Sequence, residues 1–244
     1  MGFFNGLYRF TLSNPHLTLA FMLFGSGAAL AFTELSTLAG AMIGGGATLL
    51  GSWISDFNTQ RQEIKKKKEQ EQDAKMFAQP ELYRTIEKLL TIHSRALVNY
   101  NNWLEVDLHK RNNIITDTGD IKNDFIPILP ALYPNFEYIK HLPSKELFCL
   151  ISYYDSLNEL KDAALRPWDR EGELKSNTFN WILQNAHSSL QQALNCIELF
   201  DLDNSTIQKH SGSKPLKKRI EHENEKYTQQ MKRFEKAITS KKNS

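Results

Sequence analysis

The chain has 244 residues, of which 41% are hydrophobic and 11% aromatic, and its formal net charge at pH 7 is +2. This composition excludes disorder over the whole length, and the balanced charge gives no overall reason to expect nucleic acid as a partner. The two cysteines, Cys149 and Cys196, are too few for a disulfide framework or a cysteine-rich zinc site. They fit a reducing compartment, and their apolar sequence surroundings favour a role as small hydrophobic residues.

The first 56 residues differ chemically from the rest of the chain. They contain only three charged residues, Arg9, Glu34 and Asp56, but nine of the twelve glycines. An apolar, glycine-rich segment followed by a strongly charged one is typical of a membrane-embedded part joined to a part in water. We therefore expect the chain to have two parts with different surroundings.

The N-terminal part predicts two membrane-spanning helices. From Leu17 to Ile54 the only charged residue is Glu34, close to the middle. A bilayer core about 30 Å thick is crossed by about 20 helical residues, so this stretch is too long for one span and suits two. A single tilted helix would bury Glu34 near the midplane at a cost of about 2.5 to 3.5 kcal/mol, whereas a hairpin places it in water. We predict a transmembrane hairpin over residues 15–55.

The ends of the two hairpin helices follow from capping signals. Asn14 is a good N-cap and Pro15 suits the first helical position, so the first helix is expected to run from Pro15 to about Phe32. Ser36 or Thr37 can cap the second helix. The connection between the helices is then only a few residues long.

Basic residues follow the second helix directly: Arg61, Lys65, Lys66, Lys67 and Lys68. Such residues stay on the cytoplasmic side, so two crossings place both termini in the cytoplasm. The run is expected to act as a topology signal, with contact to anionic lipid headgroups as a by-product. A cleaved signal peptide is the alternative, but it fits poorly because the apolar stretch is doubled. Residues 1–14 have the spacing of a short amphipathic helix and are predicted to lie in the membrane interface.

Seven glycines in the predicted spans are candidates for close helix packing: Gly25, Gly27, Gly40, Gly44, Gly45, Gly46 and Gly51. Gly40 and Gly44 form a GxxxG motif, and similar pairs of small residues occur on neighbouring faces. In lipid, small residues let helix backbones approach each other and gain dispersion contacts. The glycines either close the hairpin on itself or join several hairpins into a homo-oligomer, and the sequence leaves both possibilities open.

The remainder of the chain has the pattern of helices in water. Residues 56–79 lack glycine and proline and carry few apolar residues, which predicts a basic, solvated helical stalk. Pro80 is expected to open the next helix. Apolar stripes at helical spacing predict three long amphipathic helices, one capped by Ser144 and one beginning at Asn177. These helices suffice for a cytoplasmic antiparallel bundle over residues 80–203.

Residues 204–244 predict a polar hinge followed by a basic helix. Apolar residues recur at fours and sevens after Pro215, a spacing that fits a coiled-coil seam, a fourth bundle helix or a membrane-surface helix. Glu223 and Gln230 interrupt the heptad pattern, which disfavours an ideal coiled coil. The complete prediction is an all-α fold made of a transmembrane hairpin, a helical stalk, a cytoplasmic bundle and a C-terminal helix.

The sequence contains no motif for catalysis or cofactor binding. It lacks a P-loop, a dinucleotide-binding glycine motif, the HExxH zinc motif and the GxSxG nucleophile motif. His93 and His187 lie on helical faces and are expected to be packed or at the surface rather than catalytic. The acids around Gly119 lack the spacing of a calcium loop: Asp117, Asp120 and Asp124. We therefore expect no enzyme activity, no cofactor and no metal site.

The glycine-rich helices, above all GSGAALA and AGAMIGGGATLLG, belong to a two-span architecture with a helical cytosolic part. This architecture resembles the two-transmembrane effector proteins of bacterial anti-phage systems, such as those that accompany retrons or cyclic-oligonucleotide signalling. The resemblance covers about a quarter of the chain and implies a location in the bacterial inner membrane. It further implies a protein held inactive by a cytoplasmic partner, a protein or a nucleoprotein, until infection triggers permeabilisation of the membrane.

Two functions from different classes follow. The leading hypothesis is a membrane effector whose hairpins oligomerise while the bundle receives a signal. The alternative is a membrane-anchored adaptor or scaffold that holds a cytoplasmic partner and forms no pore. Loss of membrane potential on overexpression would separate the two.

Overall fold

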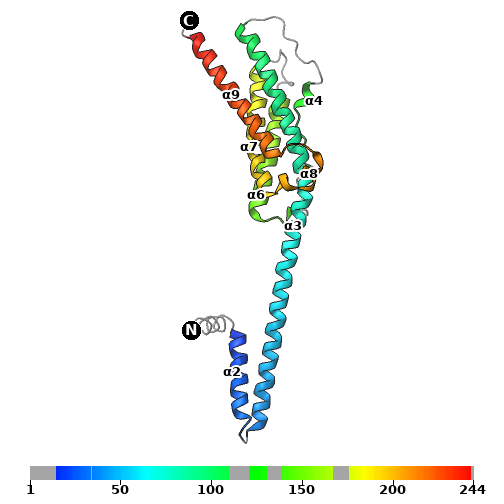
Figure 1. Cartoon of the computed structure of the whole chain (residues 1–244), viewed down its shortest axis with the longest axis vertical. Helices are drawn as coiled ribbons and strands as arrows, with labels where there is room; N and C mark the ends of the chain where they lie inside the picture. The colour runs from blue at the N-terminus through cyan, green and yellow to red at the C-terminus, as the bar shows by residue number, and fades with distance from the viewer. Residues whose placement is uncertain (1–14, 34, 110–120, 131–138, 167–175, 243–244) are drawn as a thin grey trace. The chain divides into compact units, whose positions relative to one another are not determined.

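The computed structural model describes residues 15–33, 35–109, 121–130, 139–166 and 176–242 (Figure 1). The elements are α2 (Pro15–Leu30), α3 (Ser36–His109), α4 (Ile121–Phe125), α6 (Ser144–Leu165), α7 (Ser176–Leu199), the 3-10 helix η1 (Leu202–Asn204), α8 (Thr206–Ser211) and α9 (Leu216–Lys242). No strand occurs in the described ranges, which confirms the all-α class. The predicted interfacial segment 1–14 lies outside the described residues.

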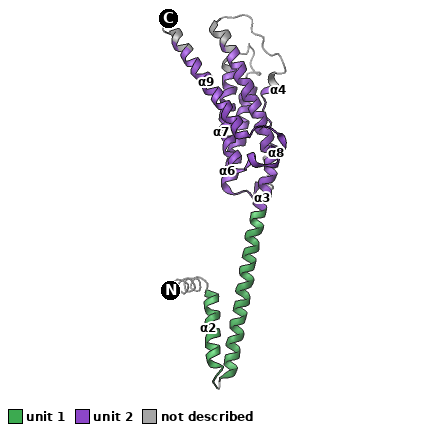
Figure 2. Cartoon of the chain, viewed as in Figure 1, with its two compact units in different colours: residues 1–69 green, residues 70–244 purple. Residues whose placement is uncertain are grey.

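The chain divides into two compact units, residues 1–69 and residues 70–244 (Figure 2). The boundary falls within α3, so the N-terminal part of this helix belongs to unit 1 and its C-terminal part to unit 2. Each unit has its own set of internal contacts.

Unit 1 contains α2 and the apolar beginning of α3. α2 ends at Leu30, two residues before the predicted end, and the hydroxyl of Thr33 donates to the carbonyl of Leu30 at 2.7 Å just beyond it. Few side chains in this unit are buried, and Leu17, Ala20 and Ala39 are among them. The large apolar side chains that unit 1 leaves exposed are Leu19, Phe21, Met22, Phe32, Leu35, Leu38, Ile43, Ile54, Phe57 and Ile64.

One helix among the described residues is long and apolar enough to cross a membrane. It is the part of α3 between Ser36 and Asn102, whose 18-residue apolar window is only 11% buried. α2 is a shorter apolar helix of 16 residues, or about 24 Å at 1.5 Å per residue. Its length falls below the thickness of about 30 Å that a perpendicular span needs.

The core of unit 2 brings together the C-terminal part of α3 with α6, α7 and the beginning of α9. Its largest fully buried side chains come from several elements: Phe125, Tyr153, Tyr154, Phe179 and Phe200. Ala74 and Ala78 of α3 belong to the same core. Core packing therefore begins inside residues 56–79, the segment predicted to be a solvated stalk.

Two predicted features of the helix starts are wrong. α3 runs through Pro80, which was expected to open a new helix. Ala78 and Leu82 are both buried in the core, and this tertiary packing holds the turns on both sides of a proline that disfavours helix by about 3 kcal/mol. Ser144 does not cap α6 but is its first residue, because Pro143 occupies the N-cap with φ −57° and ψ 149° and no side-chain cap bond is made.

The predicted polar hinge, residues 204–215, is a folded part of unit 2. α8 lies within it, and the hydroxyl of Ser205 caps this helix by accepting a hydrogen bond from the backbone N–H of Gln208 at 3.3 Å. The buried amide of Gln208 donates to the carbonyls of Ser213 at 2.9 Å and Lys214 at 3.2 Å. The polar side chains of this segment form hydrogen bonds with its own backbone. These bonds fix the conformation of the segment, so its polarity does not make it a hinge.

α9 packs into the core of unit 2 through its first turns. Leu216 and Ile220 are fully buried, and Tyr227 and Met231 pack against the same core. The backbone N–H of Leu216 donates to Asp203 at 2.7 Å, which fixes the beginning of the helix. Among the three possibilities for this helix, these contacts favour a further core helix.

Candidate functional sites in the glycine faces of unit 1 and the histidine cluster of unit 2

Two of the seven glycines, Gly27 and Gly46, lie in the contact between α2 and α3. A Cβ atom on Gly27 would lie 2.8 Å from Cγ1 of Ile43 and 3.2 Å from the carbonyl oxygen of Ala39. A Cβ atom on Gly46 would lie 3.0 Å from the ring of Phe24 and 3.3 Å from a backbone oxygen. Any larger residue at either position would force the two helices apart, so these glycines serve packing within one chain.

Four other glycines face open space. Among the residues that the structure describes, no atom lies within 4 Å of a Cβ placed on Gly25, Gly40, Gly44 or Gly51, while a Cβ on Gly45 would lie 3.8 Å from Leu23. Gly44 and Gly46 are two residues apart and therefore lie on nearly opposite faces of the helix, at 100° per residue. Within unit 1, the GxxxG pair Gly40 and Gly44 consequently lies on the side of α3 that α2 does not cover.

The predicted topology residues are all exposed on one stretch of α3: Arg61, Lys65, Lys66, Lys67 and Lys68. Lys65 lies 3.8 Å from Glu69, one turn away, and the guanidinium of Arg61 lies 4.9 Å from the ring centre of Phe57. Exposed pairs of this kind contribute little to stability. The basic run is therefore accessible to an anionic surface.

In unit 2, three helices bring polar residues together inside the core. His93 of α3 is fully buried, and its Nδ1 lies 3.4 Å from Oε2 of Glu223 in α9. A carboxylate can only accept, so this nitrogen carries the proton and donates. The other carboxylate oxygen of Glu223 accepts from Lys226 at 2.8 Å. His187 of α7 stacks on the ring of Tyr227 with centroids 4.2 Å apart, and the rings of His93 and His187 are 5.9 Å apart.

The environment of this cluster changes the acidity of two of its members. Burial of Glu223 disfavours its charge, but the hydrogen bonds from His93 and Lys226 outweigh burial and lower the pKa of the carboxyl group to about 2. Burial lowers the pKa of His187, and the neighbouring His93 lowers it further. Nε2 of His93 and Nδ1 of His187 are buried and accept or donate no hydrogen bond. The cluster therefore holds a carboxylate and favours neutral His187.

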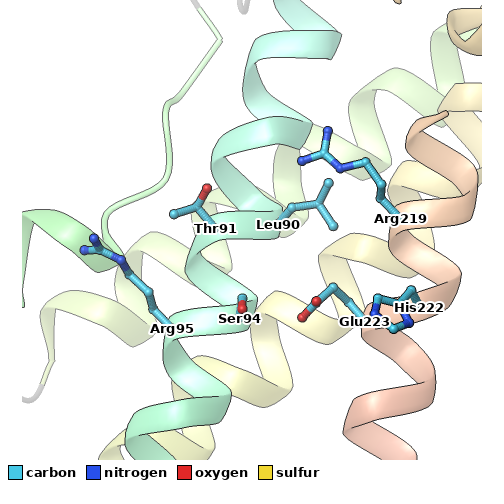
Figure 3. Close-up of a pocket in the computed structure, with 7 residues that line it drawn as sticks. All are labelled: Leu90, Thr91, Ser94, Arg95, Arg219, His222 and Glu223. Atoms are coloured by element: carbon cyan, nitrogen blue, oxygen red, sulfur yellow. The ribbon is translucent and has the colours of Figure 1, made fainter. Parts of the chain in front are cut away.

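A surface cavity of about 450 Å³ lies beside this cluster, between α3 and α9 (Figure 3). Its lining residues are Leu90, Thr91, Ser94, Arg95, Arg219, His222 and Glu223. Both arginines are already paired with carboxylates: Arg219 forms a bidentate pair with Glu87, and Arg95 pairs with Asp124. The cavity can hold a polar group, but its charges are largely neutralised.

The residues considered for metal or catalysis are not assembled into a site in the described ranges. These ranges contain no group of three or more His, Cys, Asp or Glu side chains arranged to hold a metal ion. Asp117 and Asp120 lie outside the described residues, and Asp124 pairs with Arg95. In the sequence, Glu223 interrupts the apolar heptad pattern of the C-terminal helix. A charged residue at a position where the pattern expects an apolar one was the signal in the sequence for the buried cluster.

No family model, no curated protein and no solved structure matches this chain.

Proposed function

We propose that the chain is a membrane-anchored bacterial defence effector. In this proposal α2 and the beginning of α3 form a transmembrane hairpin over residues 15–55, and hairpins from several copies assemble in the inner membrane. A partner on the cytoplasmic helical part, a protein or a nucleoprotein, triggers permeabilisation or depolarisation. The single observation that carries the proposal is the uncovered GxxxG face of Gly40 and Gly44 on an apolar helix.

The exposed apolar side chains of unit 1 support a location in lipid. Leu19, Phe21 and Met22 of α2 and Leu38 and Ile43 of α3 are exposed although they are large and apolar. Large exposed apolar side chains in this number favour an environment of lipid or of another protein surface that covers them. The basic run that follows supports a cytoplasmic end for the second helix, and with two crossings the N-terminus and the C-terminus share that side in the proposal.

The division of the glycines supports self-assembly. Gly27 and Gly46 satisfy the packing of α2 on α3, so the hairpin does not require Gly40 or Gly44 for its own closure. In lipid, a helix face without side chains lets a neighbouring backbone approach and gain dispersion contacts. The occupant with a matching small-residue face is a second copy of the same helix.

The test compares Gly44→Leu with Gly46→Leu and with Ala28→Leu, which adds comparable bulk at an exposed residue of α2. We expect Gly44→Leu to insert normally but to form smaller oligomers in cross-linking experiments, and to reduce depolarisation in overexpressing cells. Ala28→Leu should leave both readouts unchanged, and Gly46→Leu should loosen the hairpin itself. Native oligomer size and native depolarisation in Gly44→Leu would refute assembly through this face.

The adaptor function has a distinct outcome in the same experiment. If the chain is an adaptor, it inserts into the membrane without changing the membrane potential. A potential-sensitive dye reports this potential directly. Overexpression without depolarisation, together with co-purification of a cytoplasmic partner, would favour the adaptor over the effector.

A further inference from the structure

Two free thiols face each other in the core of unit 2. Cys149 of α6 and Cys196 of α7 have their Sγ atoms 3.2 Å apart. The Sγ of Cys196 also lies 3.7 Å from the backbone oxygen of Cys149. These are the only two cysteines of the chain, and they are 47 positions apart in the sequence.

The short distance between the two Sγ atoms distinguishes this pair from ordinary buried cysteines, which pack as small hydrophobic groups. A disulfide bond has a sulfur–sulfur length of about 2.05 Å, so the two atoms need to approach by only about 1 Å. The helices that carry them pack directly against each other. We propose that Cys149 and Cys196 form a reversible oxidation site, a dithiol that small hydroperoxides convert into an intramolecular disulfide between α6 and α7. This inference does not depend on the proposed membrane function.

The two thiols have different access and different acidity. Cys149 is 9% exposed, whereas Cys196 is fully buried. The hydrogen bond between the two thiols lowers the pKa of Cys149 and, together with burial, raises the pKa of Cys196. We therefore expect Cys149 to meet the oxidant first, because it is the more exposed residue of the two, its pKa is lowered, and the thiolate is the nucleophile.

The reaction has two steps. The Cys149 thiolate attacks one oxygen of hydrogen peroxide, the O–O bond breaks, and hydroxide leaves to give a sulfenic acid. The sulfur of Cys196 then attacks Sγ of Cys149, the S–O bond breaks, and the departing hydroxide takes up the thiol proton to form water. Overall the dithiol loses two electrons and two protons, and one peroxide is reduced to two waters. A reducing thiol restores the dithiol and is itself oxidised to a disulfide.

The expected physical consequence is a more stable unit 2. The disulfide would close a loop of nearly fifty residues and restrict the unfolded chain. Such a link should raise the Tm of unit 2 by about 5 to 10 °C. Small peroxides are the appropriate oxidants, because both cysteines are buried and a larger disulfide reagent has little access to them.

The experiment uses the full chain, purified in detergent under reducing conditions and then treated with one equivalent of hydrogen peroxide. We expect the free thiols, titrated after denaturation, to fall from two to none, the intact mass to fall by about 2 Da, and dithiothreitol to reverse both changes. Cys196→Ser should leave a sulfenic acid on Cys149 that dimedone traps. Cys149→Ser should give no intramolecular disulfide and much slower oxidation of the remaining thiol.

Three results would overturn the inference. They are retention of both thiols after peroxide, cross-linking between chains in place of the mass loss, and dimedone labelling of Cys196 in preference to Cys149. Circular dichroism of each serine variant checks that it is folded. If a variant unfolds, the loss of mass and its reversal in the native chain still decide the question.

Discussion

Units 1 and 2 differ in how many of their large apolar side chains they bury. Unit 1 leaves Phe21 and Met22 exposed, while unit 2 buries rings as large as those of Tyr153 and Phe179. A chain that folds in water covers its large apolar groups wherever its length allows. Unit 2 buries a core of its own, and in the proposed function lipid or further copies of the chain cover the apolar surface of unit 1.

The two units also differ in what makes their helix contacts specific. In unit 1, close approach at Gly27 and Gly46 decides the packing. In unit 2, hydrogen bonds join distant elements, as in the bond of 2.6 Å between Lys75 and Glu146 and the bidentate pair of Arg219 with Glu87. Small residues suit a low-polarity environment, and buried polar partners suit a core formed in water.

The largest expected effect is on unit 2. Leu157 is fully buried, so Leu157→Ala should lower the free energy of unfolding of this unit by about 2 to 5 kcal/mol. Phe148 is 73% exposed, and Phe148→Ala should change it by less than about 0.5 kcal/mol. Denaturant unfolding of the full chain in detergent, followed by circular dichroism, measures both. Equal losses would mean that Phe148 is covered in solution.

A pair of exposed methionines tests the contrast in surroundings. Met22 in unit 1 and Met76 in unit 2 are 66% and 59% exposed. Met22→Asp should impair membrane insertion, at about 2.5 to 3.5 kcal/mol, because it places a carboxylate among lipid tails. Met76→Asp should insert normally, since that side chain faces water. Membrane fractionation compares the two variants, and equal recovery in the membrane would contradict a lipid-facing α2.

A proline in α3 tests whether unit 2 acts on unit 1 through this helix. Gln62 is exposed in a helix interior, and Gln62→Pro disfavours helix there by about 3 kcal/mol. Pro80 is flanked by the buried core residues Ala78 and Leu82, whereas a proline at position 62 would have exposed neighbours on both sides. We expect the variant to insert and to fold unit 2, but not to depolarise cells on overexpression. Gln62→Ala is the control, and native depolarisation in Gln62→Pro would assign unit 2 the role of a tether.

Acid should weaken unit 2 through Glu223. Its pKa is about 2 in the folded chain against an ordinary value of 4.5, so its stabilising contribution is complete above pH 4.5 and is lost as pH falls toward 2. We expect a loss of about 3 kcal/mol over that range, because the pKa falls from 4.5 to about 2 on folding and each pKa unit corresponds to about 1.4 kcal/mol. Unfolding curves at several pH values measure it. Glu223→Gln should be less stable near neutral pH and show a smaller loss, and an unchanged pH profile would contradict the pairing.

The smallest effect is expected from His187. Burial lowers its pKa below 6.5 in the folded chain, so the unfolded chain binds the proton more strongly and stability falls as pH drops through 6.5. His187→Gln should remove this decline between neutral pH and pH 5 while keeping the decline due to Glu223. A variant that keeps the neutral-range decline would assign it to another group.

The sequence alone determined the class of the fold and the division of the chain by chemistry. Helical periodicity and capping are local, so they placed the beginning of α2 at Pro15 as predicted and the beginning of α7 within one residue of Asn177. The concentration of glycines in residues 15–55 was equally visible, and so was the scarcity of charge there, where Glu34 alone is charged. Local patterns also identified the candidate glycines, but not which of them contact α2.

Tertiary structure decided the rest. Packing in the core allows α3 to continue through Pro80, and hydrogen bonds of Gln208 fold the polar segment. The packing of α2 on α3 also decides which glycines lie in the helix contact and which lie on the uncovered face. Tertiary structure further paired His93 with Glu223 across 130 positions and Cys149 with Cys196 across 47. No local pattern encodes such contacts, because their free energy arises only when separate helices pack and exclude water from the groups between them.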